Sequence, residues 1–254
     1  MSSFLVHPLT LRLVSVVIAF GTWEYLGRIP ISPAFPTFLE TMTALWGMLM
    51  DGSMISVYPA TFQPLLIGLI ISSILGIACG VFMGLNHKAE WFGAPVFIVL
   101  QSAPLAALIP LLTFAYGIGL TSKIITVCIM SMPVIVLNAY TAVRHTPTSM
   151  IEMGESYLGS RRQIIMKIII PAASPVIYAG LRLGAAMGFI GAILAELLIT
   201  PTGIGDLITY NQSIAEYDKM YAAIFSIMVF AVLFIEILER TEYIFVRPDK
   251  RVTQ

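Results

Sequence analysis

The side chains that could do chemistry gather in one stretch of this chain, residues 149–171. The stretch contains two carboxylates and three basic groups, at Glu152, Glu155, Arg161, Arg162 and Lys167. Charged residues make up only 11% of the 254 residues, so this concentration sets the stretch apart. Carboxylates and guanidinium groups form charge-assisted hydrogen bonds, which indicates contact with a partner rather than catalysis.

The same stretch carries the signals of two short helices with a sharp turn between them. The capping-box pattern, Ser followed three residues later by Glu or Gln, begins at Ser149 and again at Ser160. Gly159 lies between them, where a residue in the left-handed conformation could end the first helix. Pro171 either stops the second helix or begins the next one.

The motifs of common enzyme classes are absent from the sequence. It lacks the phosphate-binding pattern Gly-x-x-x-x-Gly-Lys-Ser/Thr, the zinc pattern His-Glu-x-x-His and the nucleophile pattern Gly-x-Ser-x-Gly. Cys79 and Cys128 lie in apolar runs and are interpreted as small buried hydrophobes. We therefore expect no catalytic residue, no metal and no cofactor in this chain, and its net charge of zero argues against nucleic acid as a partner.

One pair of carboxylates invites an enzymatic interpretation. Residues 203–206, Gly-Ile-Gly-Asp, and the pair Tyr217–Asp218 resemble the motifs of intramembrane aspartyl proteases, whose two carboxylates carry out acid–base hydrolysis. That family places each Asp within an apolar span and has Tyr-Asp first. Here the order is reversed and both lie in a polar loop, so the two glycines are expected to serve tight turns instead.

The composition predicts an all-α membrane protein with a single domain over residues 1–254. The chain is 58% hydrophobic, with a mean hydropathy of +0.90, whereas a soluble domain is about 45–50% apolar. A membrane helix needs about 20 apolar residues. Six runs meet this length, at residues 9–27, 60–85, 92–116, 122–143, 174–196 and 219–240.

Basic residues predict how these spans are oriented, because they favour the cytoplasmic side. With the N-terminus inside, only Arg28, Lys123 and Lys219 lie on the outer side. The inner side receives ten: Arg12, Lys88, Arg144, Arg161, Arg162, Lys167, Arg240, Arg247, Lys250 and Arg251. Both termini and the stretch 149–171, between spans four and five, are therefore predicted to be cytoplasmic.

Small residues at four-residue spacing predict where the spans pack closely. One ladder lies in the second span and one in the fifth, at Gly68, Ser72, Gly76, Gly80 and Gly84 and at Gly180, Gly184 and Gly188. Such stripes let helices approach closely in lipid. Between the first two spans, a capping box at Thr37 and Glu40 begins an amphipathic helix, expected to be a packing helix or a contact for a binding protein.

Four polar residues within the spans are candidates for lining a substrate pathway: Gln101, Ser102, Asn138 and Arg182. Polar groups at membrane depth face a bundle interior or water. The alternative for the first three is hydrogen bonding between helices. Arg182 could meet an anionic substrate, or could pair with carbonyl groups or with a carboxylate of another subunit.

Residues 152–171 resemble the cytoplasmic loop of the membrane subunits of binding-protein-dependent ABC importers. The family pattern is Glu-Ala-Ala, three residues, Gly, nine residues, Ile, one residue, Leu-Pro, and Glu152, Ile168 and Pro171 fall in register with it. Met153 and Gly154 replace the two alanines. Leu158 stands where the family has Gly, with Gly159 directly after it, and Ile170 replaces Leu. The resemblance extends from about residue 59 to residue 240.

The resemblance implies a permease subunit of the bacterial inner membrane, working as a homodimer with two cytoplasmic ATPase subunits and an extracytoplasmic binding protein. ATP and Mg would be bound by the ATPases, so the chain itself would be no enzyme. The coupling residues implied are Glu152, Gly154, Leu158, Gly159, Ser160, Arg161 and Pro171. Residues 179–182, Ala-Gly-Leu-Arg, and the pair Ala195–Glu196 look like the nitrate, sulfonate and taurine branch.

Two alternatives remain open at this point. The chain could be a channel or a secondary carrier that needs no ATPase. Within the importer interpretation, the substrate could be an aromatic acid or a vitamin precursor, which relatives of the branch also carry, instead of a small anion.

Overall fold

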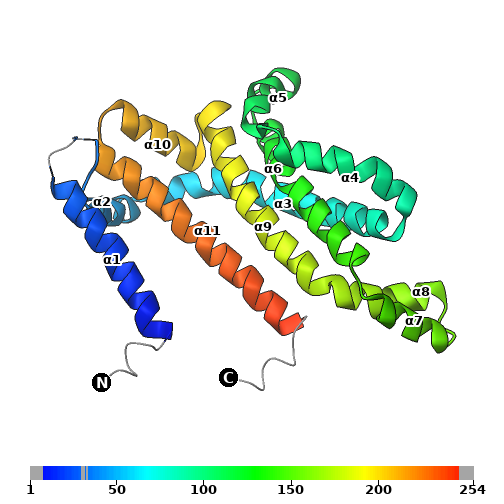
Figure 1. Ribbon diagram of the computed structural model, residues 1–254. Helices are drawn as coiled ribbons and strands as arrows, with labels where there is room; N and C mark the ends of the chain where they lie inside the picture. Colours follow the sequence, from blue (N-terminus) through cyan, green and yellow to red (C-terminus); the bar gives the residue numbers. More distant parts are fainter. Residues whose placement is uncertain (1–7, 30–31, 33, 246–254) are drawn as a thin grey trace, which may run out of the picture. The chain divides into compact units, whose positions relative to one another are not determined.

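The computed structural model describes residues 8–29, 32 and 34–245, and in this part the chain is helical, without strands (Figure 1). This confirms the predicted all-α fold class. Both termini and the predicted inner charges Arg247, Lys250 and Arg251 lie outside the described residues. The helices are α1 (Pro8–Arg28), α2 (Phe38–Met50), α3 (Ser53–Leu85), α4 (His87–Ser102), α5 (Ile109–Tyr116), α6 (Leu120–Arg144), α7 (Thr148–Ser156), α8 (Arg161–Ile164), α9 (Ile170–Leu198), α10 (Gly203–Ser213) and α11 (Tyr217–Phe245).

The contacts group the chain into two compact units, where the sequence predicts one domain. The first comprises Met1–Tyr58 with Thr202–Met228, and the second comprises Pro59–Pro201 with Val229–Gln254. The stretch 149–171 and all four pathway candidates belong to the second unit. That unit is therefore the one that positions the candidate site.

The first unit is built around α2 and its neighbours. The predicted capping box is confirmed, with the Glu40 N–H donating to Thr37 Oγ1 and the Thr37 N–H donating to Glu40. Leu45 and Leu49 pack on a buried cluster formed by Met48, Met54 and Ala222. The packing interpretation of this amphipathic helix is thus confirmed.

Four helices among the described residues are long and apolar enough to cross a membrane: Ser53–Leu85, Leu120–Arg144, Arg161–Leu198 and Tyr217–Glu242. A fifth crossing requires α4 together with residues 105–116, which are bent by 89° against each other. The predicted count of six spans stays a prediction.

The third predicted span, 92–116, differs from a straight helix for a local reason. Ala103 has ψ 147°, an extended conformation, and ends α4. The ring of Pro104 disfavours the helical region for the residue before it. A short 3-10 turn at Leu105–Leu108 then leads into α5.

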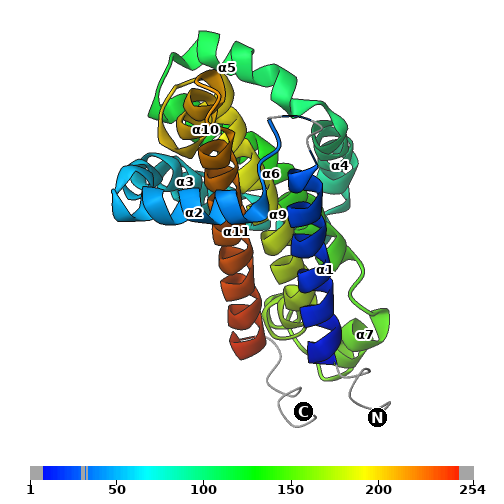
Figure 2. The same ribbon diagram turned by 90° about the vertical axis from the view of Figure 1, so that its left-hand side faces the viewer.

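The core of the second unit is α6, packed between α3 and α9. A Cβ at Gly68 would meet Val127 Cγ1 at 2.6 Å, and one at Gly84 would meet Val143 Cβ at 2.6 Å. On the other side, a Cβ at Gly188 would come within 2.6 Å of Leu69 Cδ2, while Gly180 and Gly184 lie against α6. Both glycine ladders are therefore packing surfaces, as predicted. Figures 1 and 2 show α6 and α9 side by side, with α5 and α7 at opposite ends of the pair.

Candidate functional site

The connection between α6 and α9 contains the stretch 149–171, which is called the knuckle from here on. A defined hydrogen-bond motif closes its turn. At the end of α7, the Gly159 N–H donates to Gly154 O (3.0 Å) and the Leu158 N–H donates to Glu155 O (2.8 Å). This nested pair of bonds is the Schellman motif, which satisfies carbonyl groups left open at a helix end. It turns the chain sharply after Tyr157 and fixes the angle at which α8 begins.

The left-handed residue of this turn is Leu158, and the sequence-based assignment to Gly159 was wrong. Leu158 has φ 55°, at the position where the related pattern has glycine. A left-handed conformation costs a residue with a Cβ roughly 1–2 kcal/mol. Gly159 is needed for another reason, because a Cβ there would meet Gly154 O at 2.8 Å. The turn therefore keeps its register, and the glycine next to it permits the close approach.

The two predicted helix starts have different outcomes. The capping box of Ser160 and Gln163 is confirmed by bonds in both directions, of 2.8 and 3.4 Å. The box at Ser149 is wrong, because α7 begins at Thr148 with Pro147 as its N-cap and no side-chain cap. Pro147 has ψ 127°, outside the helical region, so the helix begins at the next residue and Ser149 lies inside it.

The second short helix is not separate from the span that follows. Residues 161–198 form one continuous run, in which a π turn at Ile165–Ile169 joins α8 to α9. The Ile170 N–H donates to Ile165 O across this wider turn. Pro171, which has no N–H, then lies in the first turn of α9, where a missing donor costs little.

An apolar contact holds the two arms of the knuckle together. Gly154 is buried, and a Cβ there would meet Ile168 Cδ1 at 2.6 Å and Ile164 Cγ1 at 3.2 Å. The small residue on α7 thus lets the isoleucines of the second arm reach its backbone. This contact explains why a small residue at 154 and Ile at 168 belong to one pattern.

The exposed surface of the knuckle presents both apolar and charged side chains. Tyr157 is 83% exposed and Leu158 is 93% exposed, beside the exposed Met153. Glu152 and Arg161 are exposed as well. Exposed apolar side chains ringed by charges mark interaction surfaces.

The three uncharged pathway candidates differ in their contacts. Ser102 donates to Ile98 O (2.8 Å) and Asn138 donates to Val134 O (2.8 Å), each within its own helix. Asn138 also lies against Gly180 at the α6–α9 contact. Gln101 is exposed in the last turn of α4.

Arg182 is paired with two carboxylates of the same chain. Its guanidinium lies 3.3 Å from Glu239 Oε2 and 3.4 Å from Glu242 Oε2, both on α11. The Arg182 side chain is 27% exposed. Two anionic partners already balance this cation, which weakens the case for a free anion site at Arg182.

Sequence reasoning missed a buried ion pair at the other end of the unit. Lys123 Nζ lies 3.2 Å from Glu196 Oε1, and their side chains are 5% and 0% exposed. Thr61 Oγ1 donates to the second carboxylate oxygen at 3.0 Å, so α3, α6 and α9 meet here. The distribution of basic residues places Lys123 on the outer side but does not indicate that it is buried in a pair. The available signal was a pair of unlike charges at the predicted outer ends of adjacent spans.

Comparison with known proteins places the chain among transport permeases. It is 26% identical over 234 residues to the taurine transport system permease protein TauC of Escherichia coli (strain K12), covering 89% of this chain and 85% of that protein. It is 30% identical over 131 residues to the riboflavin transport system permease protein RibX of Chloroflexus aurantiacus, covering 52% and 49%.

Solved structures agree on the fold. A chain of the MetNI methionine ABC transporter, in an inward-facing conformation, matches with a TM-score of 0.60 and 18% identity, over 77% of this chain and 97% of that one. Residues 72–241, well over half of the chain, match the model of a protein family described as binding-protein-dependent transport system inner membrane component. The chain therefore belongs to this family, the inner-membrane permease subunits of ABC importers.

Proposed function

We propose that this permease forms the translocation pathway for a small anionic solute of the sulfonate, taurine or nitrate type, and that the knuckle at residues 149–171 couples it to separate ATPase subunits. The similarity to a taurine permease supports the substrate class. The observation that carries the coupling role is the knuckle itself, closed by the Schellman motif and exposing Tyr157 and Leu158 at its tip.

The knuckle suits the transmission of force because it is short and joined to rigid elements. It leads from α6 directly into the continuous helix that becomes α9, and these two helices pack along the glycine ladder. A push on the knuckle therefore moves both helices together. Glu152 and Arg161, both exposed, are available for charge-assisted bonds to the groove of a partner.

The proposed assembly has two copies of this chain in the bacterial inner membrane. Each copy presents one knuckle, so two ATPase subunits dock from the cytoplasm, bind ATP and Mg and carry the enzymatic activity. A binding protein delivers the solute from the outer side. Both termini face the cytoplasm in this arrangement.

Reconstitution in vesicles tests the proposed function. The purified permease alone is expected to be inert, and adding its ATPase and a loaded binding protein should start ATP-dependent uptake of an anion such as taurine. Uptake by the permease alone would show a channel or secondary carrier instead. Uptake of riboflavin but not of anions would support the vitamin-type alternative, which the RibX relative favours.

Charge reversal at Glu152 tests the docking role of the knuckle. Glu152→Arg should abolish copurification with the ATPase while membrane insertion stays intact, because the exposed carboxylate would lose its cationic partners. Glu236→Arg is a matched control, since Glu236 is exposed on α11 and pairs with Arg240 of its own helix. Normal assembly and transport by the Glu152 variant would contradict the docking role.

A further inference from the structure

Helix α4 is weakly held by apolar packing. None of its residues is buried. Trp91 and Phe92 are 74% and 83% exposed, and a Cβ at Gly93 would lie 2.9 Å from the Met83 Sδ of α3. Polar contacts therefore have a large part in setting the position of its first turns.

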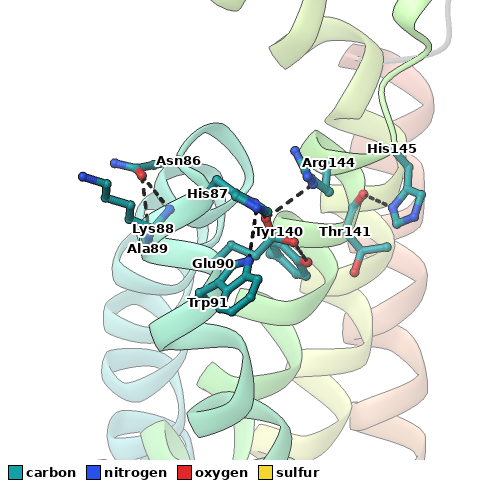
Figure 3. A network of polar contacts seen from close by, with 10 residues as sticks. All are labelled: Asn86, His87, Lys88, Ala89, Glu90, Trp91, Tyr140, Thr141, Arg144 and His145. Carbon is teal, nitrogen blue, oxygen red and sulfur yellow. Dashed lines mark hydrogen bonds and ion pairs between the residues drawn. The ribbon is translucent and has the colours of Figure 1, made fainter.

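A polar cluster around Glu90 fills this role (Figure 3). The Tyr140 hydroxyl donates to Glu90 Oε1 at 2.6 Å. The other carboxylate oxygen lies 2.8 Å from His87 Nδ1 and 3.5 Å from Arg144 Nε. Glu90 is only 17% exposed, so both of its oxygens are engaged in a partly shielded site, where charge-assisted bonds are strong.

Neighbouring residues hold the cluster in one arrangement. Trp91 Nε1 donates to His87 Nε2 at 3.1 Å, so His87 accepts there and its Nδ1 carries the proton directed at Glu90. Asn86 Oδ1 accepts from the N–H groups of Lys88 and Ala89, which caps α4. The first turn of α4 is thus fixed in itself and tied to α6.

The position of the cluster links it to the knuckle. Tyr140 and Arg144 lie in the last two turns of α6, and α7 begins at Thr148, shortly after this helix ends. Arg144 also borders a cavity of about 450 Å³ whose other walls include Glu155 and Arg161 of the knuckle. At the far side of the bend, Ile109 at the start of α5 is buried against Ala195 and Ile199 at the end of α9.

We propose that Glu90 is a positioning residue that clamps the start of α4 to the end of α6, so that a displacement of the knuckle carries α4 with it. The contact of Ile109 with the end of α9 makes the bent α4–α5 pair follow at its other end. This inference rests on the proposed coupling function of the knuckle. It assigns to Glu90, Tyr140 and Arg144 the transfer of motion from the α6–α9 pair to α4.

The test uses the complete complex of permease, ATPase and binding protein, with Glu90→Gln, Tyr140→Phe and the double variant. Assembly and basal ATP hydrolysis should remain as in the wild type, and the melting temperature should fall only as far as one lost hydrogen bond accounts for. Solute taken up per ATP should fall about tenfold, the size expected from one lost hydrogen bond to a charged group. The double variant should lose less than the two single losses added together, because both side chains belong to the same hydrogen bond.

Glu236→Gln is the matched control, since its carboxylate pairs only within α11 among the described residues, and it should leave uptake per ATP unchanged. The proposed clamp is contradicted if Glu90→Gln and Tyr140→Phe keep normal uptake per ATP. It is also contradicted if the double variant loses as much uptake per ATP as the two single variants added together. Lost assembly or a lowered melting temperature, with normal uptake per ATP in what remains, would also overturn it by showing a purely structural role.

Failure of the clamp can be told apart from failure of the coupling proposal. If Glu152→Arg still copurifies with the ATPase and transports, the knuckle itself is not the docking element. If Glu152→Arg loses the ATPase while the Glu90 and Tyr140 variants couple normally, the clamp alone is wrong.

Discussion

At the scale of single residues, Leu158 combines a backbone conformation that favours glycine with an exposed apolar side chain. Its left-handed backbone, with φ 55°, favours glycine at this position. Its side chain is nevertheless 93% exposed at the tip of the proposed docking surface. An exposed leucine in an unfavourable backbone conformation does not stabilise the isolated chain. We therefore infer that the Leu158 side chain contacts a partner.

Replacing Leu158 tests the cost of its backbone conformation and the role of its side chain separately. Leu158→Gly should raise the stability of the isolated permease by about 1 kcal/mol, because it removes the left-handed cost, and should weaken ATPase binding. Thermal unfolding in detergent and copurification measure the two effects. Gly159→Ala is the neighbouring control and should destabilise, since its Cβ would meet Gly154 O at 2.8 Å. Stronger ATPase binding by Leu158→Gly would contradict the assigned role.

The ion pair of Lys123 and Glu196 is the second single-residue feature with measurable consequences. Lys123→Met leaves Glu196 as a buried, uncompensated charge, which typically costs about 3–5 kcal/mol. The double variant Lys123→Met with Glu196→Gln should recover most of this loss, because no charge remains and Gln still accepts from Thr61. Melting temperatures of the single and double variants measure the effect. A double variant as unstable as the sum of the single ones would refute this account.

At the scale of elements, the closely packed helices α3, α6 and α9 form the rigid part of the second unit. Their seams consist of glycines against buried, β-branched side chains such as Val127 and Ile135, which have little freedom to move aside. The bent segment lies elsewhere, at Ala103–Pro104, where α4 and residues 105–116 meet at 89°. Conformational change is therefore expected at this break rather than within the seams.

The seam between α3 and α6 gives a matched pair of glycine substitutions. Gly68→Ala should destabilise the permease, because its Cβ would lie 2.6 Å from Cγ1 of the fully buried Val127. Gly47→Ala in α2 should stabilise by up to about 1 kcal/mol, the difference in helix propensity, since nothing lies within 4 Å of its added Cβ. Thermal unfolding of both variants is the measurement. Equal effects of the two substitutions would show that the seam is looser than its packing indicates.

At the scale of the whole molecule, the predicted antiparallel order of the spans accounts for the long-range contacts of the second unit. Residues predicted on the inner side meet one another, as Glu90 meets Arg144. Residues predicted toward the outer side do the same, as Lys123 meets Glu196. The knuckle and the buried ion pair thus mark opposite ends of one packed block.

Much of the fold and of the knuckle could be predicted from the sequence because these features depend on local or periodic signals. The capping boxes at Thr37 and Ser160 follow from side chains that reach backbone groups three residues away. The glycine ladders follow from helical periodicity, and the all-α membrane class follows from the length of the apolar runs. The box at Ser149 failed because Pro147, a competing local signal, started the helix earlier.

The sequence by itself determined the membrane character, the helical class, the packing faces and the register of the knuckle, since each depends on neighbours along the chain. Only the tertiary structure decided which residue takes the left-handed turn, that Arg182 is neutralised by Glu239 and Glu242, and that Glu90 joins α4 to α6. The turn depends on the close backbone approach at Gly154, and the two pairings join residues about 50 to 60 positions apart, which no local pattern encodes.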